Sequence, residues 1–382
     1  MTKEYKICKK CVSDTSIQDL KLDKNGICQY CKIHQEMEKD YPEDKYSLDR
    51  LHEIANKIKK EGKNKKYNCI VGISGGRDSS YLLYVIKEIL GLKPLAVHYD
   101  NGFNSEISTS NILNVCSNLN VDLETKVADW ETFRKVTRSF FLAGVSDPDT
   151  PTDIGIFKTM YKTAYKEDIK YVFNGHSFRT EGVEPLDWTY IDGLYVKSIN
   201  KKFGKNNLNK FDNFTLSDLI KYNFYKGIKT ILPLNYVQYD HDDVQEILEN
   251  KLGWKYYGGH HHESLLTKFV VSYYLPKKFG IDRRRTGLSA MVRSNKIQRT
   301  EAIKILDKKP EVENEKELIE YILDKLDMTE NQFQIILNQK NKNFRNFKTY
   351  YSYFGNFGFI AKILYKLGFI PKLLYLRYYG KI

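Results

Sequence analysis

The sequence predicts an α/β protein in which a parallel sheet carries helices on both faces. Two observations lead to this fold class. Between residues 67 and 173, apolar runs of strand length alternate with helical patterns of apolar residues, and four of the six cysteines precede that region, within the first 31 residues. We therefore expect a cysteine-rich module over 1–45, the sheet domain over 46–238, and a mainly helical region over 239–382.

The charge of the chain is uneven along its length. Against 48 Asp and Glu stand 61 Lys and Arg, a formal net charge of +13 over 382 residues, yet the last 43 residues contain nine basic and no acidic side chains. Because the excess is local, we expect no nucleic-acid partner. No secretory pattern follows Met1 and no run approaches the ~20 apolar residues of a membrane span, so we expect a cytoplasmic protein.

The four early cysteines form two pairs with the spacing of metal ligands. Each pair brackets two residues, and sixteen residues separate the pairs, which are Cys8 with Cys11 and Cys28 with Cys31. Cytoplasmic thiols stay reduced, so a closed site of four thiolates for structural Zn²⁺ is the favoured interpretation. An iron–sulfur cluster, a redox role and a metal-free role remain alternatives. A closed site leaves no open position for catalysis.

A glycine-rich turn follows the first apolar run, at residues 67–73. A helical pattern follows the turn, whose sequence is Ser74-Gly75-Gly76-Arg77-Asp78-Ser79. Strand, glycine-rich turn and helix together hold phosphate, because backbone N–H groups and the helix N-terminus face the anion. Asp78 beside such a site is a candidate ligand of Mg²⁺. The spacing matches neither the P-loop nor the dinucleotide fingerprint, and an ordinary turn remains the alternative.

Polar residues also follow two later apolar runs, at 94–100 and 169–173. Ligands of open parallel sheets bind at the carboxyl ends of the strands, so we expect Asp100 and Gly175 beside the phosphate loop. His176 and Arg179 are candidates to stabilise negative charge on phosphorus. We expect helices over 111–119 and 154–165, and we interpret the aromatic, lysine-rich segment 186–230 as a surface insertion.

The C-terminal region contains two further candidate sites and a basic tail. Residues 254–264 place His260, His261 and Glu263 near the start of an expected helix, where an anionic group could bind; a metal site at the histidines is less favoured. Arg283 and Arg284 suit phosphate, with a solvated charged face as the alternative. The tail 344–382 is expected to pack on the body or bind a partner, while peripheral contact with an anionic membrane stays open.

The turn at 74–79 resembles the PP-loop of ATP pyrophosphatases, which cut ATP between its α and β phosphates. The chain as a whole resembles the bacterial N-acetyl sugar amidotransferases of surface-polysaccharide and pseudaminic-acid biosynthesis. The resemblance rests on the four early cysteines and on the blocks at 74–79, 100–102, 179–182, 257–264 and 279–284. One departure is Arg77, where the family pattern leads us to expect Lys.

The resemblance implies a fold like that of the adenine nucleotide alpha hydrolases and an ATP-dependent reaction on an N-acetylated sugar of lipopolysaccharide O-antigen or flagellin. An acetamido oxygen would attack the α-phosphorus of ATP, pyrophosphate would leave, and ammonia would displace AMP from the imidoyl-AMP to give an acetamidino group. Residues 74–79 would hold ATP and pyrophosphate. The implied sugar-binding residues are Glu181, His260, His261, Glu263, Arg283 and Arg284.

The source of ammonia is expected to lie outside the chain. Thr2 follows Met1, so no N-terminal glutaminase cysteine is present, and Cys69 and Cys116 lack a glycine-flanked elbow. We expect a separate glutaminase subunit, with a cyclase-like channel protein as a second candidate partner, or free ammonia. The rival function is tRNA modification, either thiolation or lysidine formation, which also proceeds by adenylation. A non-enzymatic scaffold with a vestigial loop is a further alternative.

Overall fold

The computed structural model describes residues 4–259, 262–310, 312–354, 357–367 and 370–379. At its centre is a five-stranded sheet in which every neighbouring pair is parallel, in the order β3-β2-β1-β4-β5. The strands are β1 (Cys69–Gly72), β2 (Pro94–Asp100), β3 (Leu123–Val127), β4 (Tyr171–Phe173) and β5 (Lys229–Ile231). The predicted parallel sheet is therefore confirmed, although β5 was not expected.

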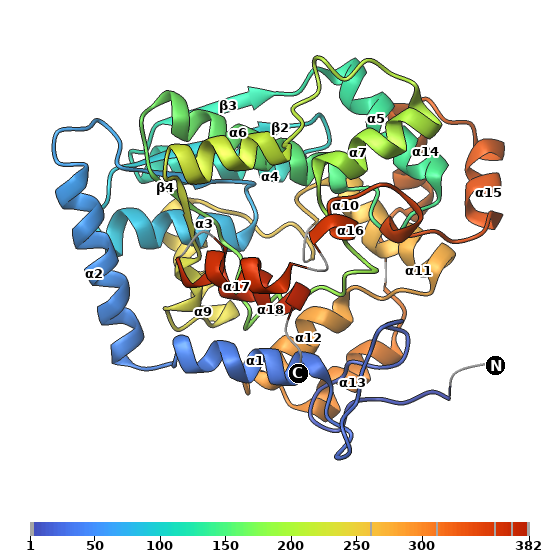
Figure 1. The fold of residues 1–382 in the computed structure, drawn as a ribbon, viewed down its shortest axis with the longest axis horizontal. Helices are drawn as coiled ribbons and strands as arrows, with labels where there is room; N and C mark the ends of the chain where they lie inside the picture. Colours follow the sequence, from blue (N-terminus) through green and yellow to red (C-terminus); the bar gives the residue numbers. More distant parts are fainter. Residues whose placement is uncertain (1–3, 260–261, 311, 355–356, 368–369, 380–382) are drawn as a thin grey trace.

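Alternate residues of the strands supply two separate cores, one on each face of the sheet. Ile70 and Val172 pack with α6 (Thr150–Lys166). Val71 and Phe173 pack on the opposite face, which is covered by α2 (Lys45–Glu61), α3 (Arg77–Tyr84), α4 (Glu106–Asn118) and α9 (His241–Leu252). Because a strand turns successive side chains to opposite faces, two unbroken apolar runs require helices on both sides, as Figure 1 shows.

The N-terminal module consists of two short turns closed by antiparallel bridges, Ile7 with Asp14 and Leu22 with Cys28, followed by α1 (Gln29–Asp40). In Figure 1 this module lies beside α12 (Arg284–Arg293) and α13 (Arg299–Asp307), far along the chain. One hydrophobic cluster joins residues of the module, the sheet domain and the C-terminal region. The module is thus built into the body of the protein.

The segment 186–230 is not a surface insertion, and that prediction was wrong. Trp188, Tyr190 and Tyr195 are at most 3% exposed and belong to the main core. The segment forms α7 (Gly193–Ile199), α8 (Leu216–Leu219) and strand β5. Its helical turns are short and separated by lysine-rich stretches, so no sustained periodicity marks its buried aromatic residues in the sequence.

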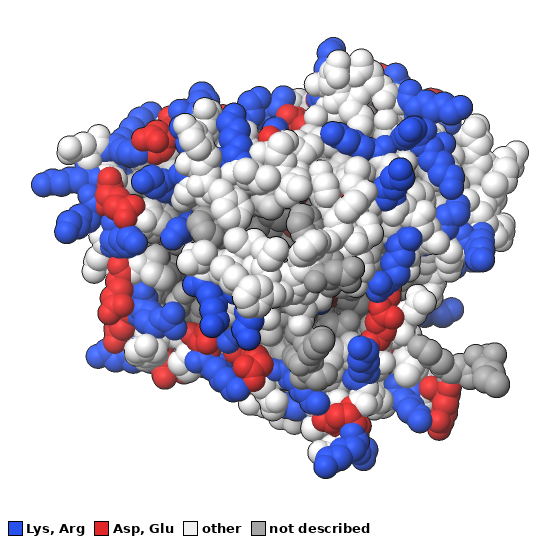
Figure 2. All heavy atoms as spheres, in the orientation of Figure 1, with Lys and Arg blue, Asp and Glu red and all other residues white. Residues whose placement is uncertain are grey.

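The C-terminal region is mainly helical, as expected. Between α4 and α6 the chain forms one more helix, α5 (Trp130–Ala143), whose buried residues belong to the same hydrophobic cluster as residues of the C-terminal region. The remaining helices are α10 (Leu265–Phe269), α11 (Leu275–Phe279), α14 (Glu315–Lys325), α15 (Glu330–Asn338), α16 (Tyr351–Phe354), α17 (Gly358–Lys366) and α18 (Lys372–Tyr379). Among the described residues, no helix has the length and apolar character needed to cross a membrane. Figure 2 shows lysine and arginine side chains concentrated around the rim of one face, with few charges at its centre.

Candidate nucleotide-binding site and metal centre

The glycine-rich turn joins β1 to α3 at the point where the strand order of the sheet reverses. From β1 the chain continues to β2 and β3 on one side of the strand, and it later returns to form β4 and β5 on the other side. Open parallel sheets bind ligands at such a switch point. Gly75 has a φ of +78°, and a Cβ on it would lie 2.2 Å from the Ser108 carbonyl oxygen. Only glycine fits this position.

The carbonyl of Gly75 is held by two side chains from distant segments. It accepts hydrogen bonds from Asn111 Nδ2 at 3.2 Å and from the buried indole Nε1 of Trp254 at 2.9 Å. Asn111 in turn accepts from the backbone N–H of Lys255 at 2.8 Å. The turn is therefore fixed by α4 and by residues 254–255 before any ligand binds.

Three backbone N–H groups of the turn donate to hydroxyl oxygens. Those of Ser74 and Gly76 donate to the hydroxyls of Ser79 and Ser74 at 3.2 and 3.3 Å, and that of Arg77 donates to the Tyr257 hydroxyl at 3.2 Å. A hydroxyl is a weaker acceptor than a phosphate oxygen. The arrangement thus gathers donors at a helix N-terminus that an anion could take over.

Asp78 lies at the start of α3, in contact with a second tyrosine. The Tyr239 hydroxyl donates to Asp78 Oδ1, and the Arg77 Nε lies 3.8 Å from the same oxygen. Gly175 sits against this helix start, since a Cβ on it would lie 3.3 Å from the Asp78 carbonyl. The loops after β1 and β4 therefore meet, as the sequence predicts.

Asp100 belongs to the neighbouring strand end, where its carboxylate organises a turn. Its Oδ1 accepts from the N–H of Gly102 at 2.9 Å and from Asn104 Nδ2 at 3.3 Å. Asn104 also contacts Nε2 of His98, whose pKa is lowered by burial. An ATP-binding role for Asp100 stays a prediction.

The turn after β2 brings Glu263 to the phosphate loop. The N–H of Ser105 donates to the Glu263 carbonyl at 2.9 Å, and the N–H of Leu265 donates to the Phe103 carbonyl at 2.8 Å. These bonds place Glu263 Oε1 3.5 Å from the Ser74 hydroxyl. Residue 263 is thus joined to the loop, whereas His260 and His261 lie outside the described residues.

The predicted site residues in the loop after β4 lie in two different places. His176 Nε2 lies 3.9 Å from Glu181 Oε2, and both side chains are partly exposed. Arg179 is 3% exposed, and its guanidinium binds the carbonyls of Asn235 and Tyr41 and pairs with Glu43 at 3.2 Å. None of these contacts of Arg179 is with the phosphate loop, so they give its predicted catalytic role no support.

Arg283 and Arg284 are engaged in ion pairs at the start of α12. Arg283 lies 3.3 Å from Glu184, and Arg284 forms a bidentate pair with Asp282. The structure joins neither to the phosphate loop through the contacts it records. Their sugar-binding role stays a prediction, and the charged-face alternative describes what they do here.

Four residues of the site were not predicted as such: Asn111, Tyr239, Trp254 and Tyr257. Trp254 and Tyr257 flank the glycine–histidine block of residues 254–264, so an unusual aromatic cluster before two glycines was the available signal. Asn111 and Tyr239 lie on or beside ordinary helices. Only the tertiary fold brings them to the loop.

The four early cysteines converge on one point. All are fully buried, and their sulfur atoms lie within 4.8 Å of one another. Three of the sulfur pairs are 3.6–3.7 Å apart. This is close to the sulfur–sulfur distance of about 3.8 Å in a zinc tetrahedron with bonds of about 2.3 Å. The site therefore fits one tetrahedral metal ion, and the separations are too short to surround a cluster of several irons.

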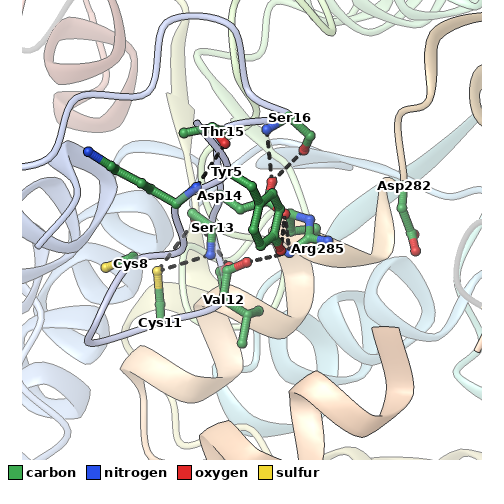
Figure 3. Close-up of polar contacts among 12 residues, drawn as sticks. Tyr5, Cys8, Cys11, Val12, Ser13, Asp14, Thr15, Ser16, Asp282 and Arg285 are labelled. Atoms are coloured by element: carbon green, nitrogen blue, oxygen red, sulfur yellow. Dashed lines mark hydrogen bonds and ion pairs between the residues drawn. The ribbon is translucent and has the colours of Figure 1, made fainter. Parts of the chain in front are cut away.

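Arginines from α12 and α13 hold the cysteine-bearing turn. Arg293 donates to Cys11 Sγ at 3.3 Å, and Arg299 donates to the carbonyls of Cys8 and Cys11. Burial alone would lower the pKa of Arg293, but the thiolates raise it above its ordinary value. Figure 3 shows Arg285 directed into the same turn, where it bonds the Val12 carbonyl at 2.7 Å.

A parallel sheet whose switch point carries this turn has the PP-loop fold that the sequence predicts. Residues 263–363 match the family described as LPS biosynthesis protein WbpG-like, C-terminal domain. The match is confined to that C-terminal part of the chain, and it supports the family resemblance seen in the sequence.

Other proteins match more distantly. An uncharacterized protein of Methanocaldococcus jannaschii is 30% identical over 129 residues, which are 33% of this chain and 43% of that protein. NMN synthetase from Francisella tularensis (16% identity, 74% and 94% of the two chains) and a U34-tRNA thiolase from Methanococcus maripaludis (15%, 67% and 80%) superpose with TM-scores of 0.31 and 0.32. Scores this low carry no argument about function.

Proposed function

We propose that this protein is an ATP-dependent amidotransferase that converts an acetamido group of an N-acetylated sugar into an acetamidino group during bacterial surface-glycan biosynthesis. Two observations support the proposal. The chain has a PP-loop at the switch point of a parallel sheet, and its C-terminal region matches a lipopolysaccharide-biosynthesis domain. The loop supports the use of ATP, and the domain supports a glycan substrate.

The reaction overcomes two weaknesses of an amide, a poor electrophilic carbon and a poor leaving oxygen. The acetamido oxygen attacks the α-phosphorus of ATP, and pyrophosphate leaves with the electrons of the broken P–O bond. Ammonia then adds to the activated carbon, AMP departs with the former amide oxygen, and a proton is released. The enzyme mainly positions reactants and stabilises developing charge.

The loop residues would act in the first half of this reaction, the transfer of AMP to the acetamido oxygen. The N–H groups of Ser74, Gly76 and Arg77 would exchange their hydroxyl acceptors for pyrophosphate oxygens, and Asp78 would hold Mg²⁺, which would offset negative charge on the nucleotide. The contact of Glu263 with Ser74 supports the proposal that the family domain reaches the same site. The sugar would then lie beside residues 257–264.

The cysteine centre is proposed as a structural Zn²⁺ site. Its four sulfurs are buried and already near tetrahedral spacing, so the donor set fits the ion and leaves no position for a substrate. The metal would supply folding free energy.

Ammonia is proposed to come from a separate glutaminase, with a cyclase-like channel protein as a further candidate. All six cysteines lie in the described residues. Outside the metal cluster, burial raises the pKa of the Cys69 thiol and the pKa of the Cys116 thiol, so neither suits nucleophilic chemistry. The same observation weakens the tRNA-thiolation alternative.

The decisive experiment incubates the purified protein with Mg²⁺, ATP, ammonium and a panel of free and nucleotide-linked N-acetylated sugars. The expected product shows the small mass decrease of oxygen replaced by NH, with AMP and pyrophosphate formed in equal amounts. Formation of ADP, or no sugar-dependent AMP from any panel member, would count against the proposal. A parallel reaction with glutamine as sole nitrogen source tests the partner, because turnover by this chain alone would remove the need for one.

A further inference from the structure

The last two helices form a hairpin that lies on the surface of the body. The rings of Tyr365 and Tyr375 stack at 5.2 Å across the two helices. Helix α18 is anchored inward, since Lys372 pairs with Asp40 of α1 at 2.7 Å and Arg377 donates to the carbonyl of Thr189. Helix α17 is the more exposed of the two and crosses the front of the molecule in Figure 1.

Helix α17 and its flanks turn large apolar side chains to the outside. We call these residues the tail patch; with their exposed fractions they are Phe357 (50%), Phe359 (77%), Ile360 (49%), Ile363 (41%) and Leu367 (59%). Residues 359, 363 and 367 recur every four positions and so share one face of the helix. The inner face is occupied by Ala361, which is 7% exposed. Apolar exposure of this density marks an interaction surface.

A second exposed apolar group lies on the same face of the molecule. Helix α8 continues as a π-helical turn, Ile220–Tyr225, on which Ile220, Phe224 and Tyr225 are 51%, 42% and 80% exposed. The Tyr350 hydroxyl, just before α16, accepts from the N–H of Leu216 at 3.4 Å, which ties the two segments together. In the shared orientation of Figures 1 and 2 both segments face the viewer, over a broad area with few charges.

Lysines predominate among the charges around this surface, although Glu36 and Asp40 of α1 lie near Tyr365 of α17. Lys362 and Lys366 are exposed beside the tail patch, and Lys221 and Lys226 flank the second group. From Lys340 to the C-terminus the sequence has no acidic residue. Exposed aromatic and aliphatic side chains bordered mainly by lysines suit the interface of an anionic bilayer, where rings insert at headgroup depth and lysines meet lipid phosphates.

We propose that the tail patch docks this protein on an anionic membrane surface. The charge complementarity selects this occupant over a second copy of the chain, because two copies meeting through the patch would bring the same lysines together. The inference does not depend on the proposed chemistry. It would place the enzyme where membrane-bound glycan intermediates are made.

The test is co-sedimentation of the full-length protein with vesicles of phosphatidylcholine alone or of phosphatidylcholine mixed with the anionic lipid phosphatidylglycerol. We expect binding only to the anionic vesicles, lost at high salt. Phe359→Ser with Ile363→Ser should lower binding at least tenfold, and Lys362→Gln with Lys366→Gln should lower it severalfold. The matched control is Ile335→Ser, which removes an apolar side chain 69% exposed on α15 and should change nothing.

Three results would overturn the proposal. The first is equal binding to neutral and anionic vesicles, and the second is no binding to either. The third is a concentration-dependent dimer, seen by light scattering, that the Phe359 and Ile363 double variant abolishes, which would assign the patch to self-association. Circular dichroism and thermal unfolding of each variant confirm that it is folded, since all the substituted side chains are exposed.

Discussion

Replacing Gly75 by alanine tests the geometry of the phosphate loop directly. At φ +78° an L-residue is strained, and the added methyl group would lie 2.2 Å from the Ser108 carbonyl oxygen and 3.0 Å from its Cα. Those atoms are backbone at the start of α4 and cannot rotate away. Either the loop or the helix must therefore move.

The free energy cost follows from three contributions. The left-handed backbone costs about 1–2 kcal/mol for a residue with a Cβ, and forcing a methyl into packed backbone costs about 1–3 kcal/mol. A shifted loop also weakens the bonds from Asn111 and Trp254 to the Gly75 carbonyl, each worth about 1 kcal/mol. We expect Gly75→Ala to lower the free energy of unfolding by about 2–7 kcal/mol and to abolish ATP binding.

Urea unfolding and calorimetric titration with Mg²⁺ and ATP measure the two effects. Gly76→Ala is the matched control, because φ there is −70° and the nearest atom to its Cβ is a side-chain oxygen of Glu263 at 3.0 Å, which can rotate. Its stability should stay within about 1 kcal/mol of the parent. If Gly75→Ala unfolds at the same urea concentration as the parent, the left-handed turn described here is wrong.

Three further variants probe the metal centre, the core and the phosphate site. Arg293→Met leaves buried thiolates without their cation and should cost about 3–5 kcal/mol, with faster loss of zinc to a chelator. Burial raises the pKa of Asp147 to about 7; a raised carboxyl pKa means that the folded state holds its proton more tightly, so stability falls as pH rises from 4 to 7. Asp147→Asn should remove that fall, at most about 4 kcal/mol, in urea unfolding at a series of pH values. Glu263→Gln should tighten pyrophosphate binding severalfold, because a negative charge near Ser74 is lost.

Each variant has an outcome that contradicts its reasoning. Arg283→Met removes a partly exposed pair and serves as control for Arg293; equal zinc loss in both would deny a special role for the buried cation. An unchanged pH profile in Asp147→Asn would mean that this carboxyl is ionised throughout. Weaker pyrophosphate binding in Glu263→Gln would show that the carboxylate helps to hold the ligand, for instance through a metal ion.

The sequence predicts those parts of the fold whose signal is local. Strands β1 and β2 are unbroken apolar runs, and the turn at 74–79 is contiguous, so its place at a strand end follows from the sequence. Strand β5 is three residues, Lys229–Ile231, none of them buried, and it joins the sheet only because β4 offers a free edge. No pattern within three half-exposed residues could indicate that.

The site is predictable to the same extent. Its loop is one motif, whereas the groups that fix it come from α4 and from residues 239 and 254–263. Arg179 illustrates the opposite case, since its position after a strand end favoured a catalytic role. Its guanidinium instead reaches the C-terminal end of α1, where it binds the Tyr41 carbonyl. The two residues are 138 positions apart, so no local sequence pattern predicts this contact.

The contacts of three C-terminal arginines with the cysteine-bearing turn bear on how the metal centre forms during translation. The four thiols leave the ribosome first, but Arg285, Arg293 and Arg299 follow more than 250 residues later. Until then the nascent module lacks the buried guanidinium of Arg293 beside its thiolates and the helices that cover them. We therefore expect metal captured early to be held less tightly than in the finished protein, in which all three arginines are in place.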